Sequence, residues 1–160
     1  MKIGHGFDVH KFCKKRQLII GGVNISYKYG LSSHSDGDVL LHSLIDAILG
    51  ASSLGDIGKW FPDTNPNYKN INSRLLLKKV FYSVLINKFN IGNIDITILA
   101  QEPILLPYIM QMRINLSTDL KCNLDLINIK STTTDKLGFI GRKEGIACFA
   151  VVFLIKKDDK

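Results

Sequence analysis

An uninterrupted apolar run near the C-terminus constrains the fold of this chain more than any other feature. It covers residues 145–155, eleven positions without a charged side chain. A membrane-spanning helix needs about 20 apolar residues, so the run is too short to cross a bilayer. A run of this length suits a fully buried strand, and we therefore expect a sheet-containing core and no membrane partner.

Strand and helix patterns alternate along the rest of the chain. Residues 1–10 and 94–98 alternate with a period of two, which is typical of strands. Strands interleaved with helices predict a single domain over residues 1–160 in the α/β or α+β class. The other expected elements are a hairpin of 17–20 and 23–26 around Gly21-Gly22, a helix over 37–50 capped by Ser35 or Asp36, a long loop over 51–72, a helix over 74–88 capped by Ser73, a helix over 107–120, a strand over 126–130 and a frayed tail over 157–160.

Charge and cysteine usage narrow the class of partner. The formal net charge is +7, yet no nucleic-acid-binding motif accompanies the basic residues, so we expect no nucleic-acid partner. A positive field also suits the steering of a small polyanionic substrate. The three cysteines, Cys13, Cys122 and Cys148, form no CxxC pair, and no apolar stretch follows the N-terminal lysine. Free thiols in the cytoplasm are therefore expected.

Asp8, His10 and His42 are candidate metal ligands. Asp8 and His10 lie two apart on the first strand and project from the same face, while His42 belongs to the following helix. Two imidazoles and a carboxylate are typical zinc donors that leave a fourth position open. Asp38 or Asp46, on the same helical stripe, could accept the other ring N–H of His42. The alternative is that these are separate polar residues, with Asp38 favouring the helix N-terminus.

A threonine-rich turn over residues 131–135 is a second candidate. Hydroxyl and N–H groups at a strand end can cradle phosphate, and Asp135 beside them could hold magnesium. The alternative is a capping box of Thr132 and Asp135 without any ligand. Arg142 could bind phosphate with two hydrogen bonds or could be an ordinary turn residue. Residues 55–64 could contact ribose or polyol hydroxyls, or could simply form turns.

Seven motifs together resemble the 2-C-methyl-D-erythritol 2,4-cyclodiphosphate synthase family. They occur in order and at family-like spacing from residue 2 to about residue 156. The motifs are Gly4-His5-Gly6-Phe7-Asp8-Val9-His10, His34-Ser35-Asp36-Gly37-Asp38-Val39-Leu40-Leu41-His42, Gly55-Asp56-Ile57-Gly58, Phe61-Pro62-Asp63-Thr64, Ala100-Gln101-Glu102-Pro103, Thr132-Thr133-Thr134-Asp135-Lys136-Leu137-Gly138-Phe139 and Gly141-Arg142-Lys143-Glu144-Gly145.

The resemblance implies a phosphorus–oxygen lyase of the non-mevalonate isoprenoid pathway. Such an enzyme converts 4-diphosphocytidyl-2-C-methyl-D-erythritol 2-phosphate into the cyclic diphosphate, through attack of the 2-phosphate on the β-phosphorus and release of CMP. It also implies a homotrimer with active sites between subunits, built on a mixed, four-stranded-type sheet packed by helices on one face with a small extra hairpin.

The resemblance further assigns roles to individual residues. Asp8, His10 and His42 would hold zinc, and Asp135 would help to hold magnesium or manganese. His34 and Thr133 would be catalytic, and Phe7 and Glu144 would border a threefold cavity, together with Arg142, that could take an isoprenoid diphosphate. The expected substrate contacts are Ser35, Asp56, Ile57, Gly58, Phe61, Asp63, Ala100, Leu105, Leu106, Thr132, Phe139 and Arg142.

Two positions depart from the family pattern. Position 135 is usually Glu but is Asp135 here, and position 104 is often Lys but is Ile104 here. The shorter carboxylate predicts retained activity with altered metal affinity or preference. Two other functions remain open: a zinc-dependent phosphohydrolase that uses water as the nucleophile, and a basic nucleic-acid-binding module.

Overall fold

The chain forms a mixed sheet, as expected. The computed structural model describes residues 1–157, and residues 158–160 of the expected tail lie outside that range. The sheet order is β4-β1-β7-β5-β6; β5 and β6 are parallel and the other neighbours are antiparallel. The four long strands fit the expected four-stranded type, and β4 adds a short edge. The strands are β1 (Lys2–Cys13), β4 (Gly30–Leu31), β5 (Phe89–Leu99), β6 (Ile127–Thr132) and β7 (Gly145–Lys156), and β2 (Leu18–Ile20) pairs with β3 (Val23–Ile25) as the separate hairpin.

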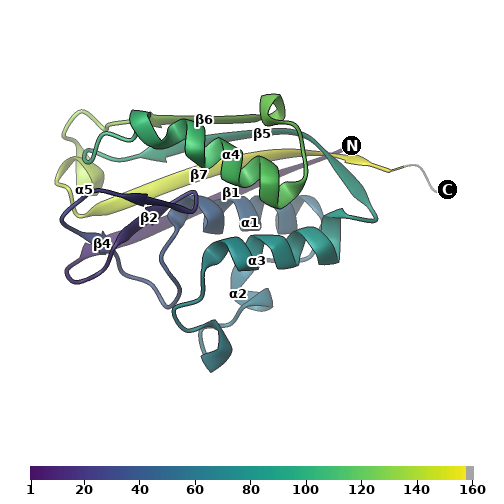
Figure 1. Cartoon of the computed structure of the whole chain (residues 1–160), viewed down its shortest axis with the longest axis horizontal. Helices are drawn as coiled ribbons and strands as arrows, with labels where there is room; N and C mark the ends of the chain where they lie inside the picture. Colours follow the sequence, from purple (N-terminus) through teal and green to yellow (C-terminus); the bar gives the residue numbers. More distant parts are fainter. Residues whose placement is uncertain (158–160) are drawn as a thin grey trace.

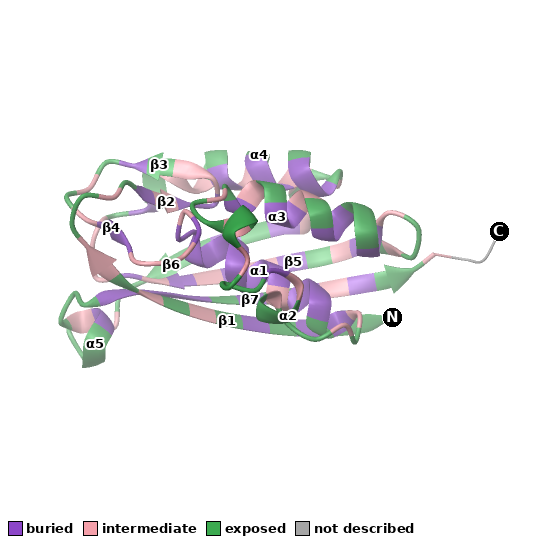
Figure 2. Ribbon diagram, turned by 90° about the horizontal axis from the view of Figure 1, so that it is seen from below, coloured by how far each residue is buried: buried purple, intermediate pink, exposed green. Residues whose placement is uncertain are grey.

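Three helices cover one face of this sheet (Figure 1). They are α1 (Val39–Ala51), α3 (Ser73–Val80), which continues into a π-helical turn over Phe81–Leu85, and α4 (Ile109–Leu120). Figure 2 shows all three on the same side of the sheet. Short helical turns occur at α2 (Ile57–Trp60), η1 (Pro66–Tyr68), η3 (Leu106–Tyr108), η4 (Leu124–Leu126) and α5 (Gly138–Gly141). The long loop expected over 51–72 therefore contains helical turns.

Gly4 and Gly6 allow α1 to lie directly on β1. A Cβ at Gly6 would stand 1.9 Å from the carbonyl oxygen of Ser43, and one at Gly4 would stand 1.8 Å from that of Ala47. No side chain fits at such distances, so glycine at both positions is what brings the helix backbone against the strand. This close packing places the first turns of α1 beside the middle of β1.

The helix ends differ in detail from the sequence expectations. Asp38, not Ser35 or Asp36, caps α1, because its carboxylate accepts from the N–H of Leu41. Asn72, not Ser73, caps α3. Lys157, which we expected in the tail, donates its N–H to the carbonyl of Lys88 and its ammonium to that of Ile86.

The strand β7 departs from the expectation of full burial. Its helix-facing side chains are buried, but Phe149, Val151 and Ile155 on the other side are 38–41% exposed in the single chain. With Ile3, Phe7 and Val9 of β1, they form what we call the apolar sheet face. The run is therefore apolar on both sides although a single chain covers only one of them.

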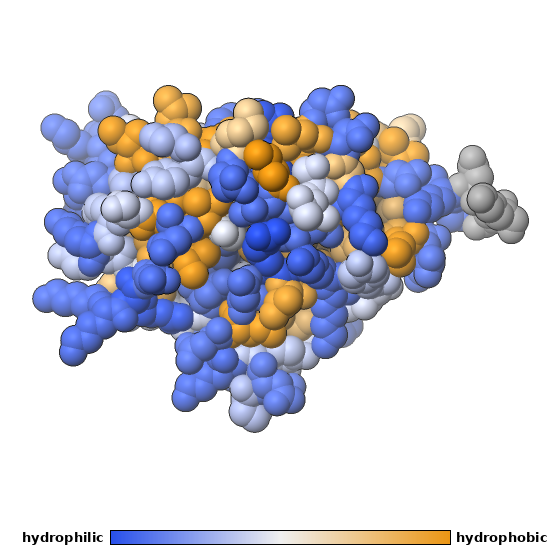
Figure 3. Space-filling view, in the orientation of Figure 1, coloured by the Kyte–Doolittle hydropathy of each residue, from blue (hydrophilic) through white to orange (hydrophobic). Residues whose placement is uncertain are grey.

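The helical side of the molecule is mixed in character. Figure 3 shows polar and apolar side chains interspersed on it, in the orientation of Figure 1. Within residues 1–157 no helix is both long and apolar enough to cross a membrane.

Candidate metal and phosphate site

Three potential metal ligands meet where α1 packs on β1. The Nε2 atom of His10 lies 2.8 Å from Oδ2 of Asp8 and 3.0 Å from Nδ1 of His42. Nδ1 of His42 is 3.1 Å from the same Asp8 oxygen. We call Asp8, His10 and His42 the metal group; one donor atom from each lies within 4.8 Å of the others.

The metal group is electrostatically coupled. Burial raises the pKa of the Asp8 carboxyl, but hydrogen bonds with His10 and His42 outweigh burial and hold that pKa well below its usual range. Burial lowers the pKa of His42, and its contact with Asp8 outweighs that and raises it. A carboxylate that stays ionised beside two imidazoles is a donor set that suits a divalent cation.

The remaining ring nitrogen of His42 contacts two serines instead of a carboxylate. Its Nε2 lies 3.0 Å from Oγ of Ser35 and 3.0 Å from Oγ of Ser73. The expectation that Asp38 or Asp46 would accept this ring N–H is wrong. The carboxylate of Asp38 accepts from backbone N–H groups of Gly21, Gly22 and Leu41, and that of Asp46 accepts from the N–H of Ile57.

Asp38 and Asp46 support the site by accepting hydrogen bonds from the backbone of neighbouring segments. Asp38 is fully buried, and burial raises its pKa to about 6 although the three N–H donors oppose the shift. It joins the β2–β3 hairpin to the start of α1. Asp46 joins α1 to α2, so that Ile57 is placed beside the metal group.

A cavity of about 340 Å³ opens beside the metal group. His34 lines it, and the buried Nε2 of this histidine has no hydrogen-bond partner within residues 1–157. Phe61 is buried on the cavity wall with its ring edge-on to Tyr68. Asp56, by contrast, is exposed and caps α2 by accepting from the N–H of Lys59. Seven other expected site residues also line the cavity: Asp8, His10, Ser35, His42, Ile57, Gly58 and Asp63.

A second, smaller cavity of about 160 Å³ lies at the ends of β5 and β6. It brings together Ala100, Leu105, Leu106, Thr132 and Thr133. We call residues 100–106 and 131–135 the strand-end loops.

The capping-box alternative for Thr132 and Asp135 is wrong. The hydroxyl of Thr132 donates to the carbonyl of Thr133, and Oγ1 of Thr133 accepts from the N–H of Asp135 at 3.4 Å. Asp135 is exposed with a φ of 53°. The turn therefore presents hydroxyls and a carboxylate outward instead of starting a helix.

Phe139 lines neither the cavity beside the metal group nor the cavity at the strand-end loops. It joins Phe7 and Phe149 in an apolar pocket of about 330 Å³ at the edge of the apolar sheet face. Arg142 and Glu144 are both exposed and form an ion pair with 2.7 Å between Nε and Oε1. The structure thus groups Phe139 with the expected cavity residue Phe7 and not with the polar substrate contacts.

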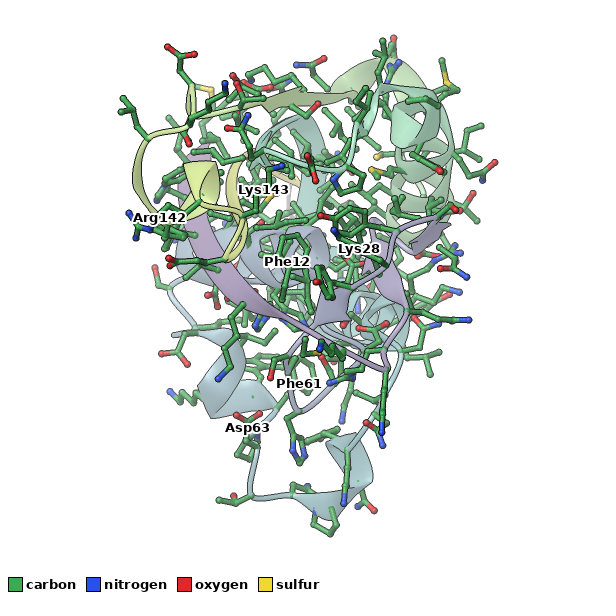
Figure 4. The ribbon with its side chains drawn as sticks, turned by 90° about the vertical axis from the view of Figure 1, so that its left-hand side faces the viewer. Phe12, Lys28, Phe61, Asp63, Arg142 and Lys143 are labelled. Atoms are coloured by element: carbon green, nitrogen blue, oxygen red, sulfur yellow. The ribbon has the colours of Figure 1, made fainter. Side chains whose placement is uncertain are left out.

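The metal group and the strand-end loops stand apart in one chain. The strand register aligns Asp8 with Cys148, Cys148 with Ile98, and Ile98 with Ser131. Three strand spacings of about 4.8 Å therefore separate Asp8 from Ser131, or about 14 Å. Among the described residues, the cavity beside the metal group and the cavity at the strand-end loops share no lining residue. Phe61 and Asp63 line the first cavity, and Figure 4 shows these two residues well apart from Arg142 and Lys143.

Sequence reasoning missed several residues of the site. Ser73 was expected only as a helix cap, although its hydroxyl contacts His42. Arg16 was counted only as a basic residue, yet its guanidinium donates to the carbonyls of Ser33 and Ser35, which flank His34. No local pattern signals either contact, because each joins segments that are distant in the sequence.

Comparison with known proteins places the chain clearly. The YgbB family matches residues 1–155. The 2-C-methyl-D-erythritol 2,4-cyclodiphosphate synthase of Photorhabdus laumondii is 59% identical over 157 residues, which is 98% of this chain and 100% of that protein.

Solved structures agree with this match. The bifunctional IspDF of Campylobacter jejuni superposes with a TM-score of 0.93 at 50% identity; 99% of this chain matches, but only 42% of that longer protein. A CDP complex of IspF from Plasmodium falciparum superposes with a TM-score of 0.85 at 38% identity, and covers 98% of this chain and 97% of its own.

Proposed function

The chain belongs to the YgbB family, and we propose that it forms 2-C-methyl-D-erythritol 2,4-cyclodiphosphate with a metal ion held by Asp8, His10 and His42. The activity is that of a cyclodiphosphate synthase, a phosphorus–oxygen lyase of the non-mevalonate isoprenoid pathway. The substrate is 4-diphosphocytidyl-2-C-methyl-D-erythritol 2-phosphate, and CMP is the second product.

The convergence of the metal group carries the proposal. Donor atoms at about 2 Å from a tetrahedral zinc ion stand about 3.3 Å from one another. The three donor pairs of the metal group are separated by 2.8–3.1 Å, so a small outward movement admits the ion. Two imidazoles and one carboxylate favour zinc and would leave one coordination position for a phosphate oxygen. A second ion, magnesium or manganese, would use the exposed Asp135.

Phosphoryl transfer in this site depends on charge and alignment. Both the attacking phosphate and the leaving CMP are already anionic, so no general base is needed. Bound cations supply positive charge that neutralises the phosphate oxygens. The unpaired Nε2 of His34 can donate to a phosphate oxygen in the larger cavity, and the hydroxyl of Thr133 can do so at the strand-end loops.

The other proposed substrate contacts are divided between the cavity beside the metal group and the cavity at the strand-end loops. Ile57 and Gly58 with the neighbouring Asp56 would meet the ribose, and Phe61 to Asp63 would border the methylerythritol part. The backbone of residues 100–106, with Ala100, Leu105 and Leu106, would hold the cytosine, and Ser35 and Thr132 would lie near the reacting phosphates. The CDP complex of the Plasmodium falciparum relative supports a nucleotide ligand for this fold.

We propose a homotrimer in which each active site combines the metal group of one subunit with the strand-end loops of another. The apolar sheet face supports association of copies, because six large apolar side chains stay exposed in the single chain. The metal group and the strand-end loops lie far apart in one chain, and this separation supports an active site shared by two subunits. The pocket of Phe7 and Phe139 would then lie at the threefold axis. Together with Arg142 and Glu144 it could take an isoprenoid diphosphate. The free thiols support a cytoplasmic location.

The proposal is tested by incubating the purified protein with the diphosphocytidyl substrate, zinc and magnesium. We expect CMP and the cyclic diphosphate in equal amounts. An acyclic phosphate product would show that water, and not the internal phosphate, is the nucleophile. Asp8→Asn should lose bound zinc and most of the activity, whereas Asp125→Asn, an exposed carboxylate of η4, should keep both.

A further inference from the structure

Ser73 and Asp36 form a short hydrogen-bonded chain behind His42. The Oγ atom of Ser73 lies 3.0 Å from Nε2 of His42 and 2.5 Å from Oδ1 of Asp36. The other carboxylate oxygen of Asp36 accepts from the N–H of Ser73 at 2.9 Å. Ser73 is fully buried, so water cannot replace either contact.

The proton positions in this chain follow from the chemistry of its members. An ionised carboxylate only accepts hydrogen bonds, so the hydroxyl proton of Ser73 points to Asp36. The lone pairs of Ser73 then face the imidazole, and the 3.0 Å contact needs a proton on Nε2 of His42. The opposite ring nitrogen, Nδ1, is the one that faces Asp8 and His10.

We propose that Asp36 and Ser73 position His42 for metal binding by keeping its ring proton on Nε2, so that Nδ1 donates its lone pair to the ion. The inference rests on the metal site of the proposed function and adds residues outside the three ligands. A metal-bound histidine typically donates its other N–H to an oxygen acceptor, and loss of that acceptor lowers metal affinity about 10–100-fold.

Ser35 cannot replace Ser73 in this role. Its hydroxyl also lies 3.0 Å from Nε2, but it accepts from the N–H of Gly37 and contacts Oγ of Ser33 at 3.3 Å. No carboxylate fixes its proton, so it can serve as donor or acceptor. Asp36 alone therefore determines which way the hydrogen bonds from Ser73 and His42 point.

The test compares zinc affinity and a proton resonance in three proteins. Chelator competition should show that Ser73→Ala binds zinc about 10–100-fold more weakly than the unmodified protein. Ser52→Ala removes another buried hydroxyl, one without a partner within residues 1–157, and should leave the affinity unchanged. In the ¹⁵N-labelled, zinc-loaded protein, the Nε2–H of His42 should give a slowly exchanging downfield signal that Ser73→Ala loses.

A second variant guards against a simple folding effect. Asp36→Ala keeps the Ser73 hydroxyl but frees its proton, and should weaken zinc binding and speed exchange of the Nε2 proton in the same direction. Equal zinc affinity and an unchanged Nε2–H signal in Ser73→Ala would overturn the inference while leaving the metal site intact. An unmodified protein that binds no zinc would overturn both the inference and the proposed metal site.

Discussion

The metal group and the strand-end loops differ in how complete they are within one chain. Asp8 and His10 of the metal group are partly buried and His42 is buried, and two segments distant in sequence, β1 and α1, hold the donors in contact. Half of the residues of the strand-end loops are exposed, Asp135 among them. Helix-on-strand packing can preform a site in one subunit, whereas a pair of strand ends forms only part of one. This difference agrees with the proposal that another copy of the chain completes the second half.

The largest predicted effect is that of a glycine substitution beside the metal group. Gly6→Ala puts a methyl group 1.9 Å from a backbone oxygen of α1, so the helix must move away from β1. We expect a loss of at least about 4 kcal/mol in the free energy of unfolding, together with loss of zinc binding. Urea unfolding and metal analysis measure both.

The matched variant is Gly138→Ala, at the start of α5 and three residues after the strand-end loops. Gly138 has a φ of 64° and no atom within 4 Å of an added Cβ, so only the backbone conformation is strained. The expected loss is about 1 kcal/mol, with zinc binding unchanged. Equal losses for the two variants would contradict the view that the metal region needs glycine at position 6 because the backbones of α1 and β1 lie so close together.

Removal of the Asp38 carboxylate tests how much its hydrogen bonds stabilise the start of α1. Asp38→Ala leaves three backbone N–H groups without an acceptor in a buried setting, and each such group costs about 1–3 kcal/mol. We expect a loss of about 3 kcal/mol in unfolding experiments. Asp125→Ala, at an exposed position, should stay within about 0.5 kcal/mol of the unmodified protein.

The first region also shows what sequence patterns can and cannot supply. The period of two in residues 1–10 places Asp8 and His10 on one face, and the caps and apolar spacing locate most helices within a few residues. The partner of His42 could not be found this way, since Ser73 is 31 residues away and meets it only after α3 packs. Nor could the apolar run of β7 reveal that its outer side is left uncovered by the chain itself.

Asp135 offers a test of the second region alone. Asp135→Glu restores the longer side chain of the family pattern and should change the magnesium or manganese concentration for half-maximal activity several-fold, because carboxylate reach sets the ligand geometry. Stability and zinc content should not change, since Asp135 is exposed. Metal titrations that coincide for the two proteins would count against a role for this carboxylate.

Ile104→Lys should have the smallest effect. Ile104 is 80% exposed and lines the cavity at the strand-end loops, where the proposed contacts to the base are made by the backbone. We expect calorimetric CDP affinities to differ by less than about 3-fold, because an exposed, solvated charge contributes little. A tenfold gain would mean that a charged side chain at this position contacts the nucleotide.

Subunit complementation tests the shared site most directly. His42→Ala lacks a metal ligand and Thr133→Ala lacks a strand-end hydroxyl, so each homotrimer should be nearly inactive. In trimers formed from an equal mixture, about one quarter of the sites should combine an intact metal group with intact strand-end loops from the neighbouring subunit, and about one quarter of the activity should return. Mixed trimers that stay as inactive as their parents would place both halves in one chain and contradict the account.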